Sequence, residues 1–306
     1  MTDQQRTGRT GGRTARRTRP AAGAALLAAV LAGAAALAGC SPDAAGGVDA
    51  ASADQQASSA PEQLSADPLT AVRGAADITG RSGSARAATE LVTESAEKKA
   101  VFTGTGGYDY VKRIGRLEVQ VPPGAATTGK IVEVLLPGTV YLQNSGAKVP
   151  EGKWVKLDVR QLPDGNLVSG GATDPSSAAG ALRGAQKAEL LGAETLDGVA
   201  LKHYRGTLDL AKAADATGGR GGDGLRMGAQ TFTVKEVPYD VWLDDQGRLH
   251  KVVEVFTFAG VAGSKEAKDQ VKVVSTTTLS DFGAPVEAAE PPAADIFAMK
   301  PTESPK

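Results

Sequence analysis

The sequence predicts an α+β protein built on one long antiparallel sheet of about ten strands, with two helices. Aromatic residues make up only 4% of the chain, whereas glycine, threonine and valine are plentiful, which favours strands and turns over a helix bundle. Short runs rich in valine or leucine end repeatedly at clusters of turn-forming residues. Two Asp-Pro pairs, at Asp67-Pro68 and Asp174-Pro175, are typical of helix starts, because aspartate caps the helix and proline suits its first position.

The first helix is expected from Pro68, with an apolar stripe that includes Leu69, Val72 and Ile78 and with glycines that end it. The second is expected over 176–185. The glycine-rich stretch 211–230 is interpreted as a mobile loop with at most a short helical piece. Within it, Gly219, Gly221 and Gly224 satisfy G-x-G-x-x-G by chance, since no strand and helix flank them.

The expected strands follow the same pattern of apolar runs that stop at turns. They cover 84–93, 101–110, 114–121, 130–136, 139–143, 153–160, 188–193, 200–210, 231–243, 248–258 and 271–279. The strongest hairpin joins 231–243 to 248–258 through the turn 244–247. The tail from Ala284 is rich in proline, and Ile296-Phe297 is expected to dock on the body.

Several strands are apolar on both faces. In 248–258, Leu249, Val253 and Val255 alternate with Val252 and Phe256, and 131–136 is mostly apolar throughout. An antiparallel sheet with one solvated face should alternate cleanly. Two apolar faces need two covers: helices on one side, and a second sheet or a hydrophobic cavity on the other. A solid sandwich core and a curved sheet around a cavity both fit this pattern.

The chain opens like the precursor of a bacterial lipoprotein. Six arginines precede an apolar run that ends at Leu37-Ala38-Gly39-Cys40, and Cys40 is the only cysteine. We expect residues 1–39 to be a signal peptide, with a diacylglyceryl group and an N-acyl chain on Cys40 as the membrane anchor. A transmembrane helix is the alternative, but the run is mostly alanine and glycine and therefore weakly hydrophobic. Export by the Sec or the Tat route stays open.

Composition divides the rest into a flexible tether at 40–67, a folded domain at 68–283 and a proline-rich tail at 284–306. Residues 1–39 hold six of the 34 basic and one of the 35 acidic side chains, which leaves 28 against 34 and a net charge of −6. An acidic body argues against nucleic acid and against anionic lipid head groups as broad electrostatic partners. The expected location is the extracytoplasmic face of the cell membrane.

The chain offers little for catalysis or for metal binding. A serine elbow is absent, His203 and His250 have no spacing partner, and both are expected to face solvent on strands. Asp244-Asp245 is explained by its hairpin turn rather than by calcium. We therefore expect no enzymatic activity, no catalytic residue, no metal, and no cofactor other than the lipid on Cys40.

Three stretches carry a resemblance to a known group: 137–142 (PGTVYL), 153–158 (KWVKLD) and 237–249 (VPYDVWLDDQGRL). With the lipobox, the tether and the helix at Asp67-Pro68, they make the chain similar to the actinobacterial LppX/LprG-type lipoproteins, which are related in fold to the LolA carriers. The resemblance implies a strongly curved half-barrel sheet with helices across its concave face. It also implies that acyl chains of lipids or lipoglycans are held between the two.

The residues expected to line such a cavity are apolar strand positions. They are Leu91, Leu117, Val119, Val134, Leu136, Val155, Leu157, Val241, Leu243, Val253 and Val255. The alternative function is a module that has no ligand and contacts or senses another protein of the cell envelope, which the threonine-rich outer faces favour.

Overall fold

The computed structural model describes residues 64–95, 99–123, 129–144, 149–168, 172–258 and 270–297. All of them belong to one compact unit, 55–299. This unit holds every described helix and strand together with their common core, so it can fold on its own. Cys40, the expected signal peptide and most of the expected tether lie outside the described residues.

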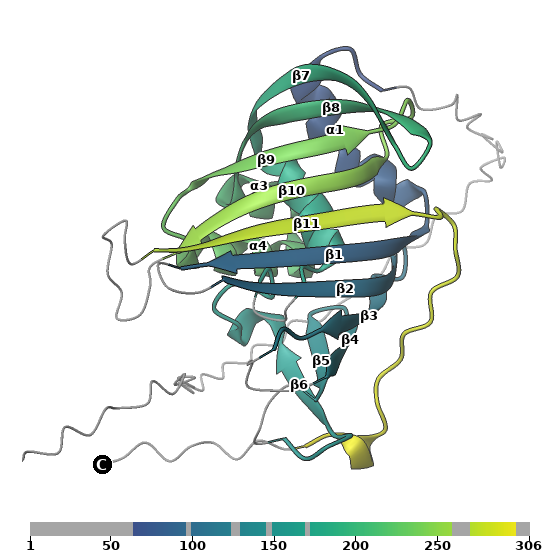
Figure 1. Ribbon diagram of the computed structural model, residues 1–306, viewed down its shortest axis with the longest axis vertical. Helices are drawn as coiled ribbons and strands as arrows, with labels where there is room; N and C mark the ends of the chain where they lie inside the picture. The colour runs from purple at the N-terminus through teal and green to yellow at the C-terminus, as the bar shows by residue number, and fades with distance from the viewer. Residues whose placement is uncertain are drawn as a thin grey trace, which may run out of the picture. The chain divides into compact units, whose positions relative to one another are not determined.

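The described strands form one open antiparallel sheet in the order β6-β5-β4-β3-β2-β1-β11-β10-β9-β8-β7 (Figure 1). Six strands come from the first half of the chain: β1 (Ser84–Glu94), β2 (Lys99–Asp109), β3 (Ile114–Gln120), β4 (Lys130–Leu136), β5 (Thr139–Gln143) and β6 (Trp154–Asp158). Five come from the second half: β7 (Ala185–Leu196), β8 (Val199–Asp209), β9 (Glu236–Leu243), β10 (Leu249–Phe258) and β11 (Val271–Ser280). The pairing of β1 with β11 joins two meanders into one sheet.

Four helices cover one face of this sheet: α1 (Pro68–Arg81), α2 (Pro175–Ala181), α3 (Leu210–Thr217) and α4 (Gly219–Thr231) (Figure 1). The two Asp-Pro starts are confirmed, because the side chain of Asp67 accepts a hydrogen bond from the Thr70 amide at 2.8 Å and that of Asp174 from the Ser176 amide at 2.7 Å. The expected α+β half-barrel, a curved antiparallel sheet with helices on its concave face, is therefore the fold.

Interpreting 211–230 as a loop was wrong, because this stretch forms most of α3 and α4. Its glycines allow close packing: a Cβ at Gly222 would lie 2.4 Å from the Ala214 carbonyl oxygen, and one at Gly224 would lie 2.8 Å from that of Gly165. Because glycine has a low helix propensity, the sequence predicts a loop here. Tertiary contacts nevertheless make the segment helical. The following strand consequently begins at Glu236 instead of 231.

The main core lies between the helices and the concave face. Alternation along β10 places Val252 and Phe256 in it, and both are completely buried. From the helix side the core receives mostly small residues, such as Ala75 of α1, Ala178 of α2 and Ala213 of α3. The helix layer therefore meets the sheet through few large side chains.

The opposite, convex face has a cover of its own over β3 to β6. Residues 284–297, which we call the strap, run from the end of β11 to the side of β6, in yellow in Figure 1. The Tyr141 hydroxyl donates to the Glu290 carboxylate at 2.5 Å, and Ile296 pairs with Trp154. The second cover is thus the tail itself instead of a second sheet, and the docking of Ile296-Phe297 is confirmed.

Candidate functional site

The structure divides the eleven residues that were expected to line a cavity between the two faces of the sheet. Seven point toward the helices: Leu91, Leu117, Val119, Val155, Leu157, Val241 and Leu243. The other four, Val134, Leu136, Val253 and Val255, lie on the convex face. One space cannot hold all eleven, and this corrects the expectation.

Two local features explain the four misplaced residues. In β10 an irregularity between Leu249 and Lys251 shifts the register, so Leu249 joins Val252 on the concave face and Val253 turns outward. A one-residue shift moves every later side chain to the other face. In β4 both faces are apolar, so alternation alone could not choose between them, and Val134 in fact packs under the strap.

A group of buried polar side chains interrupts the apolar concave face near its middle. Glu254 of β10, Ser275 and Thr277 of β11, and Thr89 of β1 occupy neighbouring strands with almost no solvent exposure. Glu254 lies directly opposite Ser275, and Thr277 lies directly opposite Thr89. We call these four residues the polar cluster.

Most of the polar cluster has no hydrogen-bond partner. Both carboxylate oxygens of Glu254 and the hydroxyls of Thr89 and Thr277 are buried and unpartnered in the described structure. Ser275 alone is satisfied, by the Thr173 hydroxyl at 2.6 Å. Burial without a counter-charge raises the pKa of Glu254 well above its ordinary value, which favours the protonated carboxyl.

A second buried carboxyl lies toward the β4 side of the same face. Glu133 is completely buried, and its Oε1 accepts a hydrogen bond from the Asn166 side-chain amide at 2.7 Å. Oε2 of Glu133 and Oδ1 of Asn166 are left without partners. Burial raises the pKa of Glu133 to about 8, so at neutral pH it carries a proton that it can donate. Asn166 has a left-handed backbone, φ 66°, in the segment that leads to α2.

The hollows of the described structure are distributed unevenly over the two faces. A small one of about 40 Å³ lies at the concave end beside α2 and α4, near Tyr108 and Asp174. Hollows of about 500 and 730 Å³ lie on the convex face beside the strap. The concave interior is closely packed in this conformation, and its candidate site consists of apolar surface, the polar cluster and the helices over them.

Both histidines were expected to face solvent, and this was wrong for each. His203 is stacked on Trp242 with ring centroids 4.1 Å apart, and its two ring nitrogens face the carboxylates of Glu194 and Asp240 at 2.7 and 2.6 Å. His250 contacts Asp244 at 3.1 Å. Asp244 also accepts two backbone hydrogen bonds within its turn, as its place in the hairpin predicts.

Sequence reasoning missed Glu254 and Glu133, which are the most unusual side chains of the concave face. The signal was present, since each stands among apolar residues in a strand, at the spacing of the inward-facing positions. The expected lining included only valine and leucine positions, so these two glutamates were not among the candidates.

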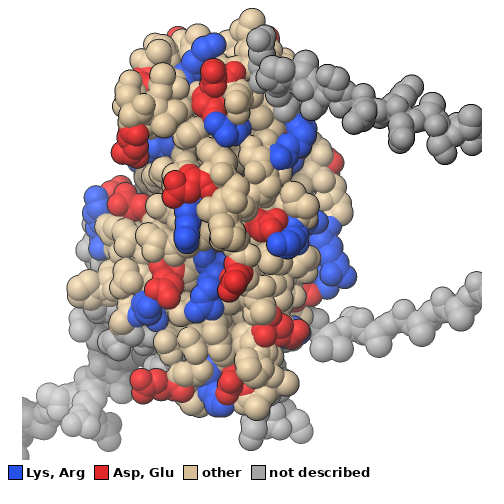
Figure 2. All heavy atoms as spheres, turned by 90° about the vertical axis from the view of Figure 1, so that its right-hand side faces the viewer, with Lys and Arg blue, Asp and Glu red and all other residues tan. Residues whose placement is uncertain are grey.

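One face of the molecule can be judged for its distribution of charge. On the face drawn in Figure 2, acidic and basic side chains are interspersed, with no extended patch of one sign. Among the described residues, no helix is both long and apolar enough to cross a bilayer.

No family model matches this chain, and no curated protein matches its sequence. Among solved structures, the chain is similar to LprF from Mycobacterium bovis, with 16% identity, a TM-score of 0.41, and coverage of 75% of this chain and 99% of that one. It is also similar to the lipoprotein LppX from Mycobacterium tuberculosis, with 12% identity, a TM-score of 0.43, and coverage of 72% and 97%.

A third similar structure is the LolA superfamily protein NE2245 from Nitrosomonas europaea, with 11% identity, a TM-score of 0.30, and coverage of 71% and 95%. LprF and LppX are themselves lipoproteins of the LppX/LprG type. At these identities the likeness is one of fold alone.

Proposed function

We propose that this protein binds the apolar part of an amphiphile between its helix layer and the concave face of its sheet. A lipid on Cys40 would hold it at the extracytoplasmic face of the membrane. In this proposal the described conformation is the closed, empty one. The seven helix-facing residues named above provide apolar contact, and the polar cluster meets a polar group of the ligand.

The observation that carries the proposal is the unpartnered polar cluster in an otherwise apolar interior. A buried polar group without a partner costs about 1–3 kcal/mol. Four such atoms, two on Glu254 and one each on Thr89 and Thr277, therefore destabilise the closed state by several kcal/mol. Ligand sites are typically apolar surfaces with a few polar groups that orient the ligand. A ligand hydroxyl or amide at this depth would provide the missing hydrogen bonds.

The helix layer is built so that it can separate from the sheet. Its buried contacts are mostly alanines, including Ala71, Ala75, Ala179 and Ala214. Alanine buries little area, and the stabilisation lost on opening scales with apolar area at about 25 cal/mol per Å². An acyl chain replaces that contact at about 0.8 kcal/mol per buried CH₂ group.

Purification of residues 41–306 without detergent, followed by native mass spectrometry, tests this proposal. We expect a co-purified amphiphile in a large fraction of the protein, released on denaturation. Glu254→Leu should lose most of it, whereas Glu90→Leu, a change at an exposed position of β1, should retain it.

The proposal would be contradicted if the wild-type protein is empty in every preparation and does not take up added fatty acids or phospholipids. The module that contacts another envelope protein would then be the better interpretation. The anchor is tested separately: the wild-type chain should incorporate labelled palmitate in a bacterial host, and Cys40→Ser should not.

A further inference from the structure

The two hollows on the convex face lie outside the concave site. They adjoin each other and share Arg116 of β3 together with Val286 and Glu287 of the strap. The first has a volume of about 500 Å³ and the second about 730 Å³. Together they offer space for a ligand on a face that the proposed function does not use.

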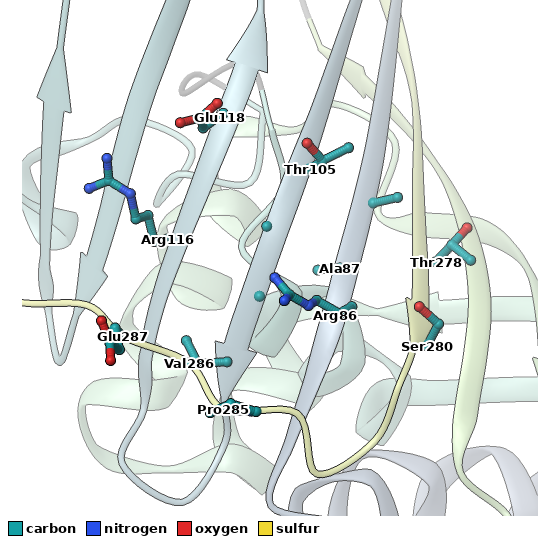
Figure 3. A pocket seen from close by; sticks show the side chains of 13 residues that line it. Arg86, Ala87, Thr105, Arg116, Glu118, Thr278, Ser280, Pro285, Val286 and Glu287 are labelled. Carbon is teal, nitrogen blue, oxygen red and sulfur yellow. The ribbon is translucent and has the colours of Figure 1, made fainter.

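The first hollow contains two arginines in one transverse row of the sheet. Arg86 of β1 and Arg116 of β3 both pair with Gly107 of β2, so about 10 Å separates their backbones. Figure 3 shows Arg86 reaching over β2 from one side, with Arg116 beyond it. Gly107 has no side chain, and Val286 of the strap packs over it: a Cβ there would lie 3.0 Å from the Val286 Cγ2.

Neither arginine forms a direct ion pair in the described structure, although the hydrogen bond from Lys130 and, after it, the charge of nearby Arg116 lower the pKa of the Glu118 carboxyl. Among the described residues, no carboxylate lies within ion-pair distance of the Arg86 or the Arg116 guanidinium. Glu118 is engaged by Lys130 at 2.6 Å, and Glu287 stands at the edge of the hollow (Figure 3). The hydroxyl groups of Thr105 on β2 and of Thr278 and Ser280 on β11 also line the hollow. Unpaired guanidinium groups beside hydroxyls are typical of sites for phosphate or carboxylate groups.

The second hollow is apolar and begins where Arg116 ends. The sheet contributes Ile114, Val134 and Trp154 beside Arg116. The strap contributes valine, alanine and proline residues and two glutamates, Glu287 and Glu290, the second of which is held by Tyr141 and Lys156. Trp154 is mostly buried, and its ring belongs to the small core under the strap. A hollow that holds two arginines and opens directly into one lined largely by apolar side chains matches a ligand with an anionic head and a hydrocarbon tail.

We propose that the two hollows form one binding site for an anionic amphiphile on the convex face. The phosphate or carboxylate group would lie between Arg86 and Arg116, and the hydrocarbon chain would lie against Val134 and Trp154 under the strap. The site is separate from the concave interior. Its two arginines stand on a body that is acidic overall, with Glu118 and Glu287 in the same lining.

The fluorescence of Trp154 provides the test. Residues 41–306 with Trp242→Phe retain Trp154 as the single tryptophan and are titrated with dodecyl phosphate below its micelle concentration. We expect a saturable change in Trp154 emission. Arg86→Gln with Arg116→Gln should weaken binding about ten- to a hundredfold, because hydrogen bonds to charged groups are lost.

Matched variants separate the two halves of the site. Lys272→Gln removes one positive charge at the far end of the same face of β11 and should bind like the parent. Ala289→Phe, at an exposed position that lines the second hollow, adds no second tryptophan. It should weaken the binding of dodecyl phosphate but leave the weak binding of inorganic phosphate unchanged. Glu254→Leu should have no effect, which distinguishes this site from the concave one.

Three outcomes would overturn the inference. Equal binding of dodecyl phosphate and the neutral dodecyl maltoside would show that the arginines recognise no head group. Equal binding of inorganic and dodecyl phosphate would show that the apolar hollow takes no part. Unchanged affinity in the double arginine variant, with the fold verified by circular dichroism, would contradict the site outright.

Discussion

Glu254 is the residue on which the concave site depends. A carboxyl group with two unpartnered oxygens stands in the middle of a packed apolar face, where a leucine would fit the strand equally well. Natural proteins accept such a loss of stability where function requires it. The closed conformation should therefore become more stable when this carboxyl group is removed.

Glu254→Leu is expected to stabilise the empty protein by about 1–3 kcal/mol, because an orphaned polar group is replaced by an apolar one. For a domain of this size, that corresponds to a rise in Tm of about 2–4 °C per kcal/mol. Differential scanning calorimetry on delipidated protein measures it. Glu254→Gln retains a buried polar group and should bring no gain. A leucine variant that is less stable than the parent would contradict the claim that the unpartnered carboxyl of Glu254 destabilises the closed state.

Glu133 makes stability depend on pH in the direction that its raised pKa dictates. Its pKa is about 8 in the folded protein and 4.5 ordinarily. Below pH 4.5 both states hold the proton. As pH rises to about 8, the unfolded chain releases it while the folded chain retains it, so stability falls by up to about 1.4 kcal/mol per pH unit. Above pH 8 this contribution stays constant.

Glu133→Gln should flatten this fall while keeping the contact with Asn166 through the amide oxygen. The measurement is urea unfolding of both proteins from pH 5 to 8.5. Glu254 contributes in the same direction, so the difference between the two curves isolates Glu133. Parallel curves would mean that Glu133 ionises freely and is not buried as described.

At the scale of elements, the strands and two of the helices could be predicted, and the glycine-rich helices could not. The strands end at turn residues that local chemistry specifies, and Asp67 and Asp174 cap their helices as expected. Helix α4 contains five glycines in thirteen residues, and only its contacts with α3 and with the segment before α2 explain why it is helical. The contact with Gly165 joins residues far apart in the sequence, and the contact with Ala214 crosses from one helix to the next, so neither appears in the local pattern of the sequence.

Gly222→Ala should destabilise the protein although alanine is the better helix former by about 1 kcal/mol. The new Cβ would lie 2.4 Å from the Ala214 carbonyl oxygen, so α3 and α4 would have to move apart. Gly221→Ala is the matched control: its Cβ meets only side chains, the flexible Arg113 and the methyl of Thr217, each at 3.0 Å. Thermal unfolding should place the Gly221 variant at or above the parent. A Gly222 variant at the same level would refute the close packing.

Which face each strand buries was only partly predictable. Seven of the eleven candidate residues faced the helices, and the four others were misplaced by a register shift in β10 and by a strand that is apolar on both sides. The cover that makes β4 apolar on its convex face is the strap, more than 140 residues away in the sequence. The pattern of apolar residues along a strand indicates that a face of the sheet is covered, but it does not indicate which segment covers that face.

At the scale of the whole molecule, the strap is part of the folded body. A chain that ends after Gly283 would expose Val134, Tyr141 and Trp154, so we expect a loss of a few kcal/mol in unfolding free energy and increased binding of hydrophobic dyes. A chain that ends after Phe297 keeps every described contact of the strap and serves as the control. Identical urea midpoints for the two truncations would show that the strap contributes nothing to stability.

The sheet thus has two covered faces with different covers, and the central claim concerns the concave one. Photo-crosslinking with a diazirine-labelled neutral fatty acyl probe, followed by peptide mapping, tests it most directly, because Val252 and Val253 are adjacent in β10 yet face opposite sides. The account predicts adducts on inward-facing residues such as Val252, Phe256 and Val273, and their loss in Glu254→Leu. Adducts confined to Val253 and Val255, or none at all under saturating probe, would contradict it.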